Sequence, residues 1–261
     1  AFELKNQLSD IFASPHLAGF VISFMRLCLA IAVAWVSVLG LIKLGVVEHQ
    51  TLDQTYIAPA REFFLRYGFS LAWLLLALVG LYRISDIVLG VISNVFYYDL
   101  GFSKPEIGTV VKSFGLLMTI VGGFLGGLLS IRFGVIRVLF LGGVLSAATN
   151  LLFMVLVAKG HDFTWLYIVI SADNLSAGIA SAAFVAFLSS LTNISFTAMQ
   201  YAIFTSLMTL LPKILGGYSG TMVDGMGYSN FFLLTALMGV PVLVLIVYIG
   251  RRRQFAFKLR D

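Results

Sequence analysis

Five charged residues lie inside stretches of sequence that are otherwise apolar, and their types and spacing point to chemistry. Arg83 and Asp86 are spaced i, i+3, so on a helix they share one face and can form an ion pair. Asp173 and Lys213 have no charged neighbour within one helical turn, and Lys112 lies about two turns inside its apolar segment. A charge at the centre of a bilayer costs at least about 2.5–3.5 kcal/mol, so each is a candidate functional residue.

The chemistry that these charges predict is the binding of an anion together with a proton. Buried cations suit a ligand that carries several carboxylates, and desolvation favours the protonated form of a carboxyl group, whereas a neighbouring cation favours the carboxylate. Asp173, without a local cation, is the better proton carrier. The simpler alternative is that the charges form structural ion pairs, or that Lys112 extends to the membrane interface.

Polar residues in the same apolar segments can complete a hydrated cavity or, equally, form hydrogen bonds between helices. They are Ser85, Asn94, Ser113, Asn150, Asn174 and Gln200. We therefore assign substrate binding to Arg83, Lys112, Lys213, Asn174 and Gln200, and proton coupling to Asp173 and Asp86.

The composition of the chain indicates which elements position these residues. Of 261 residues, 60% are hydrophobic and 11% charged, and the mean hydropathy is +1.00. Soluble domains carry about 45–50% apolar and about 25% charged residues, so the chain is an all-α integral membrane protein by composition. The net charge of +5 is not gathered on a soluble face, which argues against nucleic acid as a partner and favours membrane lipid.

Segments of about 20 apolar residues predict membrane-spanning helices. Seven are expected, near residues 20–46, 69–97, 105–131, 135–158, 163–191, 198–223 and 229–250. We divide the chain into a leading segment with an extra transmembrane helix (1–47), a cytoplasmic connection (48–68), a six-helix transporter half (69–250) and a cytoplasmic tail (251–261). Because the first residue is Ala1 and not Met, we expect the C-terminal part of a longer polypeptide; the alternative is a processed form.

Lys and Arg in the loops predict the orientation, because cytoplasmic loops carry an excess of both. One side receives Arg61, Arg66, Arg132, Arg137 and Arg251 to Arg253, and the other receives Lys104 and Lys159. A cytoplasmic C-terminus follows. Gly122-Gly123-Phe124-Leu125-Gly126 also reappears as Gly216-Gly217-Tyr218-Ser219-Gly220, which favours a 3+3 inverted repeat; the alternative is ordinary glycine-mediated helix packing.

No arrangement of residues indicates an enzyme. His16, His49 and His161 are widely separated and lack metal-ligand spacing, and Cys28 has no second cysteine to pair with. Neither a cofactor nor a metal is predicted.

One loop carries a family signature. Gly127, Arg132, Gly134 and Arg137 form the pattern Gly-x-x-x-x-Arg-x-Gly-x-x-Arg, which resembles the cytoplasmic signature loop of the major facilitator superfamily. The resemblance implies a conformational gate at these four residues. Ile131 stands where the usual pattern has Asp, so this loop departs from the signature at its acidic position.

More narrowly, residues 51–250 resemble the C-terminal part of AmpG-type muropeptide permeases. The matching runs include Pro59-Ala60-Arg61-Glu62-Phe63-Phe64, Leu81-Tyr82-Arg83-Ile84-Ser85-Asp86, Leu100-Gly101-Phe102, Asp173-Asn174-Leu175-Ser176-Ala177-Gly178, Ala183-Phe184-Val185-Ala186 and Ala198-Met199-Gln200-Tyr201-Ala202. The resemblance implies a proton-driven importer of anhydro-muropeptides in the bacterial inner membrane, which serves peptidoglycan recycling and β-lactamase induction.

Such a carrier encloses its site between two six-helix halves, so an N-terminal half is expected in the same or another chain. The alternatives are a related carrier for another bulky anion, such as an acyl-coenzyme derivative or a peptide, and a non-transporting membrane scaffold on a carrier fold. A scaffold has no need of five intramembrane charges, which argues against it.

Overall fold

The structure, a computed structural model, describes residues 53–251 and, before them, residues 22, 25–26, 28–30, 32–34, 36–37 and 40. The chain divides into two compact units, residues 1–62 and 63–261, and we describe each by itself. In the first unit the scattered described residues between 22 and 40 are helical. Most of the expected leading helix (20–46) and the tail from residue 252 lie outside the described residues.

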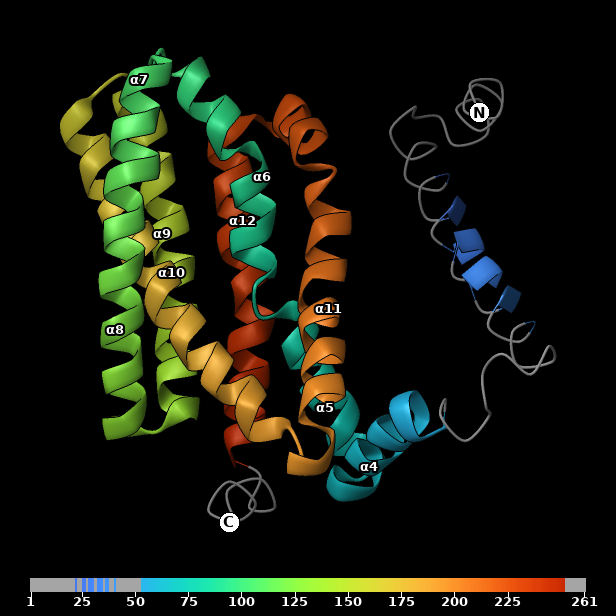
Figure 1. Cartoon of the computed structure of the whole chain (residues 1–261). Coiled ribbons are helices and arrows are strands. Elements are labelled where there is room, and N and C mark those ends of the chain that lie inside the picture. The colour runs from blue at the N-terminus through green and yellow to red at the C-terminus, as the bar shows by residue number, and fades with distance from the viewer. Residues whose placement is uncertain are drawn as a thin grey trace. The chain divides into compact units, whose positions relative to one another are not determined.

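The second unit is a bundle of long helices that lie side by side (Figure 1). Six segments are long and apolar enough to cross a membrane. The described part of the chain contains no strand, and the prediction of an all-α membrane protein with a six-helix unit is confirmed. The elements, in order, are η1 Asp53–Ile57, α4 Ala58–Tyr67, α5 Phe69–Leu81, α6 Ile84–Asp99, α7 Lys104–Ile107, η2 Gly108–Phe114, α8 Gly115–Phe133, α9 Val135–Lys159, α10 Phe163–Leu191, η3 Ile194–Phe196, α11 Thr197–Gly216 and α12 Ser219–Arg251.

The first spanning segment is broken near its middle, although its hydropathy predicts one continuous helix over 69–97. Helix α5 ends at Leu81 and α6 begins at Ile84, with Arg83 at φ −98° and ψ 11° between them. Tyr82 is buried: its hydroxyl donates to the Leu139 carbonyl at 3.0 Å, and its ring stacks on Phe184 at 4.6 Å between centroids. These contacts with α9 and α10 hold the break; neither residue between the two helices is a glycine or proline, and Gly80 lies in the last turn of α5.

The prediction of a helix over 198–223 is wrong at its end. Helix α11 stops at Gly216, and α12 already begins at Ser219 and contains a non-helical residue at Gly227 (φ 75°, ψ 163°). Ser219 is fully buried, and its hydroxyl donates to the Val88 carbonyl of α6 at 2.8 Å. This tertiary contact fixes the turn at 217–218, and a hydropathy window does not detect it.

The glycine runs that favour an inverted repeat have different surroundings in the two places. Gly122 and Gly126 lie inside α8 and are buried against the backbone of α10, whereas Gly216 and Gly217 lie at the end of α11. The inverted repeat stays a prediction, since the second copy of the glycine run lies at a turn.

Helices α8 and α10 cross closely because glycines remove side chains from the contact. A methyl group on Gly122 would lie 2.2 Å from the Leu175 carbonyl oxygen, and one on Gly178 would lie 2.3 Å from that of Thr119. Small residues allow such close backbone approach in membranes. The crossing brings Thr119 of α8 next to Asn174 of α10, at 3.1 Å, and so shapes one wall of the site described below.

Gly122→Ala is therefore expected to lower the free energy of unfolding by about 1–3 kcal/mol, because the added methyl group meets backbone that cannot move aside cheaply. Gly123→Ala is the matched control, since a Cβ there meets nothing within 4 Å. Unfolding in mixed detergent micelles, followed by tryptophan fluorescence, measures both. Equal losses in the two variants would contradict the close crossing.

Candidate functional site

A cavity of about 370 Å³ lies among α6, η2, α8, α9 and α10. It gathers residues that are far apart in the sequence and that include both signs of charge. The lining residues that carry the argument are Arg83, Asp86, Lys112, Thr119, Asp173 and Asn174. Five of them are residues that the sequence singles out, so the structure brings together two cations, two acids and an amide in one place.

The charged pair of the cavity lies near the middle of the spanning segment Phe69–Asp99. Arg83 and Asp86 follow the break between α5 and α6, within the segment Phe69–Asp99. Discontinuous helices are a common device in transporters, where binding residues lie near the bilayer midplane. The break thus presents Arg83 and Asp86 at the depth where carriers bind ligands.

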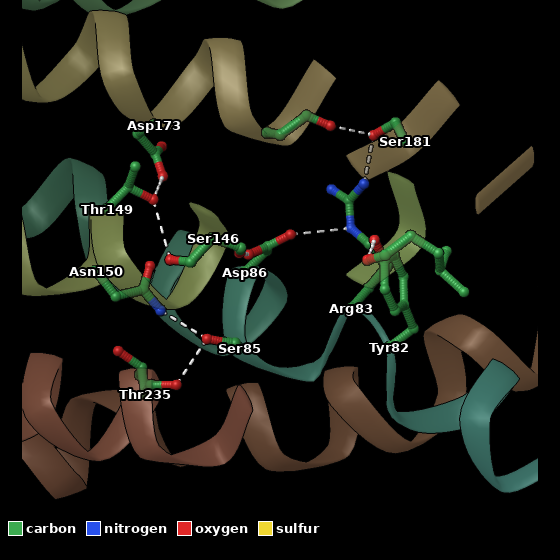
Figure 2. A network of polar contacts seen from close by, with 12 residues as sticks. Tyr82, Arg83, Ser85, Asp86, Ser146, Thr149, Asn150, Asp173, Ser181 and Thr235 are labelled. Atoms are coloured by element: carbon green, nitrogen blue, oxygen red, sulfur yellow. Dashed lines mark hydrogen bonds and ion pairs between the residues drawn. The ribbon is translucent and has the colours of Figure 1, made fainter. Parts of the chain in front are cut away.

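Arg83 and Asp86 form an ion pair that two serines support (Figure 2). Arg83 Nε lies 3.2 Å from Asp86 Oδ2, and the two side chains are 22% and 17% exposed. Arg83 Nη1 donates to the Ser181 hydroxyl of α10, and the Ser146 hydroxyl of α9 donates to Asp86 Oδ1. The start of α6 is therefore tied to two neighbouring helices through charged hydrogen bonds.

Asp173 lies in the same cavity without a cationic partner. Its Oδ1 accepts a hydrogen bond from the Thr149 hydroxyl at 3.3 Å, and no ion pair joins it to any residue that the structure describes (Figure 2). A carboxyl group in this position can gain or lose a proton without breaking an ion pair.

Lys112 is the cation of the cavity that no carboxylate holds. It lies in η2, a π-helical segment, and within the described part of the chain its ammonium forms no ion pair. Short π-helical segments are rare and often occur at functional sites. Asn174, unlike Lys112, already has hydrogen-bond partners. Its Nδ2 donates to the Ile170 carbonyl at 3.0 Å, and its Oδ1 accepts from the Thr119 hydroxyl.

Behind the ion pair lies a buried group of polar residues that is satisfied internally. Asn150 Nδ2 donates to the Ser85 hydroxyl at 2.6 Å, and that hydroxyl donates to the Thr235 carbonyl of α12 at 2.6 Å. Ser85 and Asn150 therefore join α6 to α9 and α12 and do not line the cavity. Of the polar residues expected to complete a hydrated cavity, the lining includes Asn174 but not Ser85, Asn94, Ser113, Asn150 or Gln200.

The structure separates two expected binding residues from the cavity. Lys213 lies in the last turn of α11, because that helix ends at Gly216, and it is exposed near the helix end and not at mid-depth. Gln200 is buried, and its Oε1 accepts from the Asn193 backbone amide at 2.7 Å, which links the start of α11 to the connection from α10. Neither residue lines the cavity.

Five hydroxyl residues of the site were missed from the sequence: Ser93 and Thr119, which line the cavity, and Ser146, Thr149 and Ser181, which bond to its charged residues. One signal was available for Ser181, because Asp173, Ala177 and Ser181 are spaced by four and so share a helix face. Ser146 and Thr149 are spaced by three on α9, but nothing in the sequence distinguishes them from serines and threonines that bond to their own helix.

The signature-loop residues lie at the α8–α9 turn, away from the cavity lining. Gly134 makes this turn with φ 87° and ψ 147°, a conformation that residues with a side chain rarely adopt. Arg132 lies over the Phe133 ring, 5.4 Å from its centroid, and Arg137 is in the first turn of α9. Gly127 lies within α8, where a Cβ meets nothing within 4 Å.

A bundle with six apolar spanning segments, four of which line a cavity that contains ionisable residues, defines a membrane transporter. The chain matches the Major Facilitator Superfamily over residues 73–256, and it belongs to that family. The expected family is thus confirmed, and the family points to a transporter and not an enzyme.

Individual relatives narrow the comparison. The chain is 31% identical over 210 residues to a transporter named AmpG 4 from Rickettsia conorii. This match covers 80% of this chain and 50% of the relative. It is 35% identical over 199 residues to the anhydromuropeptide permease of Escherichia coli K12, a match that covers 76% of this chain and 40% of the relative. It is 34% identical over 213 residues to an uncharacterized protein of Haemophilus influenzae, a match that covers 79% of this chain and 50% of the relative. The chain spans about half the length of these relatives or less, and the resemblance to AmpG-type permeases is confirmed.

Proposed function

We propose that the chain is one half of a proton-coupled importer of anhydro-muropeptides in the bacterial inner membrane. The observation that carries this is the meeting of Arg83, Asp86, Lys112 and Asp173 in one cavity, which is lined by four of the six apolar spanning segments. The similarity to a permease named for anhydro-muropeptides supplies the substrate. The principal alternative is a carrier of the same kind for another bulky anion.

The charges of the cavity fit an anionic substrate. Arg83 is held by Asp86 and Ser181, whereas Lys112 forms no ion pair with any residue that the structure describes and is available for a substrate carboxylate. Binding pockets for small molecules measure about 300–1,000 Å³, and 370 Å³ is at the lower end of that range. A disaccharide peptide needs more room, so an N-terminal six-helix half, in the same or another chain, supplies the opposite wall.

Proton coupling rests on the two acids of the cavity. Asp173 binds and releases the proton because no ion pair must break, and Asp86 is the second candidate because its partner Arg83 lies where a substrate carboxylate can compete for it. The gate of the proposed carrier is the α8–α9 turn with Gly127, Arg132, Gly134 and Arg137, as in the family resemblance. Gly134 fixes the angle of that turn.

The expected result of Lys112→Gln is a loss of at least about 10-fold in the apparent affinity for substrate, since a hydrogen bond to a charged group contributes about 1.5–3 kcal/mol. Uptake of labelled anhydro-muropeptide is measured in cells that produce the complete transporter. Lys104→Gln, in the exposed first turn of α7, is the matched control. Unchanged uptake by Lys112→Gln would refute the role of Lys112, and competition by an acyl-coenzyme derivative but not by muropeptide would favour the alternative substrate.

We further infer that the end of the bundle with the α8–α9 turn is cytoplasmic, and with it the C-terminus. Arg66, Arg132, Arg137 and Arg251 lie at this end, and cytoplasmic ends carry the excess of Lys and Arg. In a Cys28→Ser background, Lys159→Cys is expected to react with an impermeant thiol reagent in intact cells, and Arg137→Cys only after the membrane is opened. The reverse pattern would invert the topology.

A further inference from the structure

Three arginines lie together at the end of the bundle that contains the α8–α9 turn. Arg132 is in the last turn of α8, Arg137 in the first turn of α9, and Arg251 ends α12. Helix α12 packs along α9, and a Cβ on Gly250 would lie 3.3 Å from the Ile136 side chain, so Arg251 follows a residue in contact with the start of α9. We call these three exposed residues the arginine patch.

The arginine patch has no acidic partner among the described residues of its unit. Asp86 and Asp173 lie in the cavity, and the remaining carboxylates of residues 63–251 belong to the opposite ends of the helices: Asp99, Glu106, Asp162 and Asp224. Arg66 lies at the same end of the bundle but is not part of the patch, because its guanidinium donates to the Leu191 carbonyl at 2.6 Å. The patch thus keeps a positive charge that the described residues do not neutralise.

Large apolar side chains surround these charges on the surface. Ile131, next to Arg132, is 86% exposed, and Phe133 and Phe140 are 47% and 37% exposed. Ile131 stands where the signature loop ordinarily has an acid, so this chain has an apolar side chain where a carboxylate would hold the arginines. The surface therefore offers guanidinium groups beside an apolar wall, which matches a molecule with an anionic head and a hydrocarbon tail.

We propose that the arginine patch binds the phosphate of an anionic phospholipid, whose acyl chains lie along the exposed apolar residues of α8 and α9. Guanidinium groups bind phosphate oxygens through paired hydrogen bonds, which an ammonium cannot reproduce. Each basic residue near an anionic membrane surface contributes about tenfold or less to binding. The lipid supplies the negative charge that the signature loop of this chain lacks.

The test measures lipid retention by the purified complete transporter with native mass spectrometry, using phosphatidylglycerol, phosphatidylcholine and inorganic phosphate as probes. We expect phosphatidylglycerol to bind at least about tenfold more tightly than phosphatidylcholine, and the double variant Arg132→Gln with Arg137→Gln to lose about 30-fold in that affinity. Lys104→Gln with Lys159→Gln, at the opposite end, is the matched control and should retain it.

Three results would overturn the proposal. They are equal binding of the two lipids, equal binding of phosphatidylglycerol by the double variant and the wild type, and displacement of the lipid by inorganic phosphate at comparable concentration. Arg132→Lys with Arg137→Lys guards against a folding artefact. It keeps the charge but not the paired hydrogen bonds, so it should retain part of the lipid selectivity, more than the Gln double variant does, while its circular dichroism matches that of the wild type. No transport is measured, so failure here leaves the proposed function untouched.

Discussion

Asp173→Asn is expected to abolish accumulation of substrate against a gradient while leaving substrate binding almost unchanged. Asn keeps the size of the side chain and can still bond to the Thr149 hydroxyl, but it cannot carry a proton. Since Asp173 holds no cation in the described part of the chain, the change leaves no buried charge without a partner. Folding is therefore expected to survive, and the loss falls on coupling.

Two measurements on the complete transporter separate coupling from binding. Net uptake driven by a proton gradient should disappear in Asp173→Asn, whereas exchange of labelled for unlabelled substrate across the membrane should persist, because exchange needs no net proton movement. Asp224→Asn, an exposed acid in α12, is the isosteric control and should transport normally. If uphill uptake persists in Asp173→Asn, the proton is carried by Asp86 or by the other half.

The membrane-spanning segments could be predicted from the sequence because the bilayer imposes one strong requirement on them. About 20 apolar residues are needed to cross it, and the helices over 105–131, 135–158 and 163–191 agree with the observed segments to within a few residues. The cost of an intramembrane charge is equally general, and it singled out Arg83, Asp86, Lys112 and Asp173, which meet in the cavity.

What could not be predicted depends on contacts between helices. The hydrogen bond from Tyr82 to Leu139 determines where α5 ends, and the one from Ser219 to Val88 determines where α12 begins. Hydropathy averaged over a window detects neither contact, because it registers only the apolar character of the sequence. Because α11 ends early, Lys213 lies near a helix terminus and not in the interior of the helix expected over 198–223. Ser146 and Ser181 were missed for the same reason. Each hydroxyl belongs to the site only because the fold places it beside a charged group, Asp86 or Arg83, to which it bonds.

Arg83→Gln alone is expected to reduce the amount of folded protein, since it leaves Asp86 as an uncompensated charge in the interior. Removal of one partner of a buried ion pair costs about 3–5 kcal/mol, whereas replacing both is often tolerated. The Ser146 hydroxyl stays bonded to Asp86 and compensates only part of the loss. Arg83→Gln combined with Asp86→Asn should therefore restore folded protein in the membrane, measured by fluorescence-detected size-exclusion chromatography.

Uptake by that double variant decides what Arg83 does beyond holding Asp86. If the pair is only structural, folding and transport recover together. We expect folding to recover and transport not to, because Arg83 lies at the break of a discontinuous helix, where its guanidinium can exchange Asp86 for a substrate carboxylate. Ser181→Ala is the control, since it removes the neutral partner of Arg83 and leaves the ion pair and most transport in place. Wild-type uptake of an anhydro-muropeptide by the double variant would refute the binding role of Arg83, and Lys112 would then be the cation of this cavity that holds the anion.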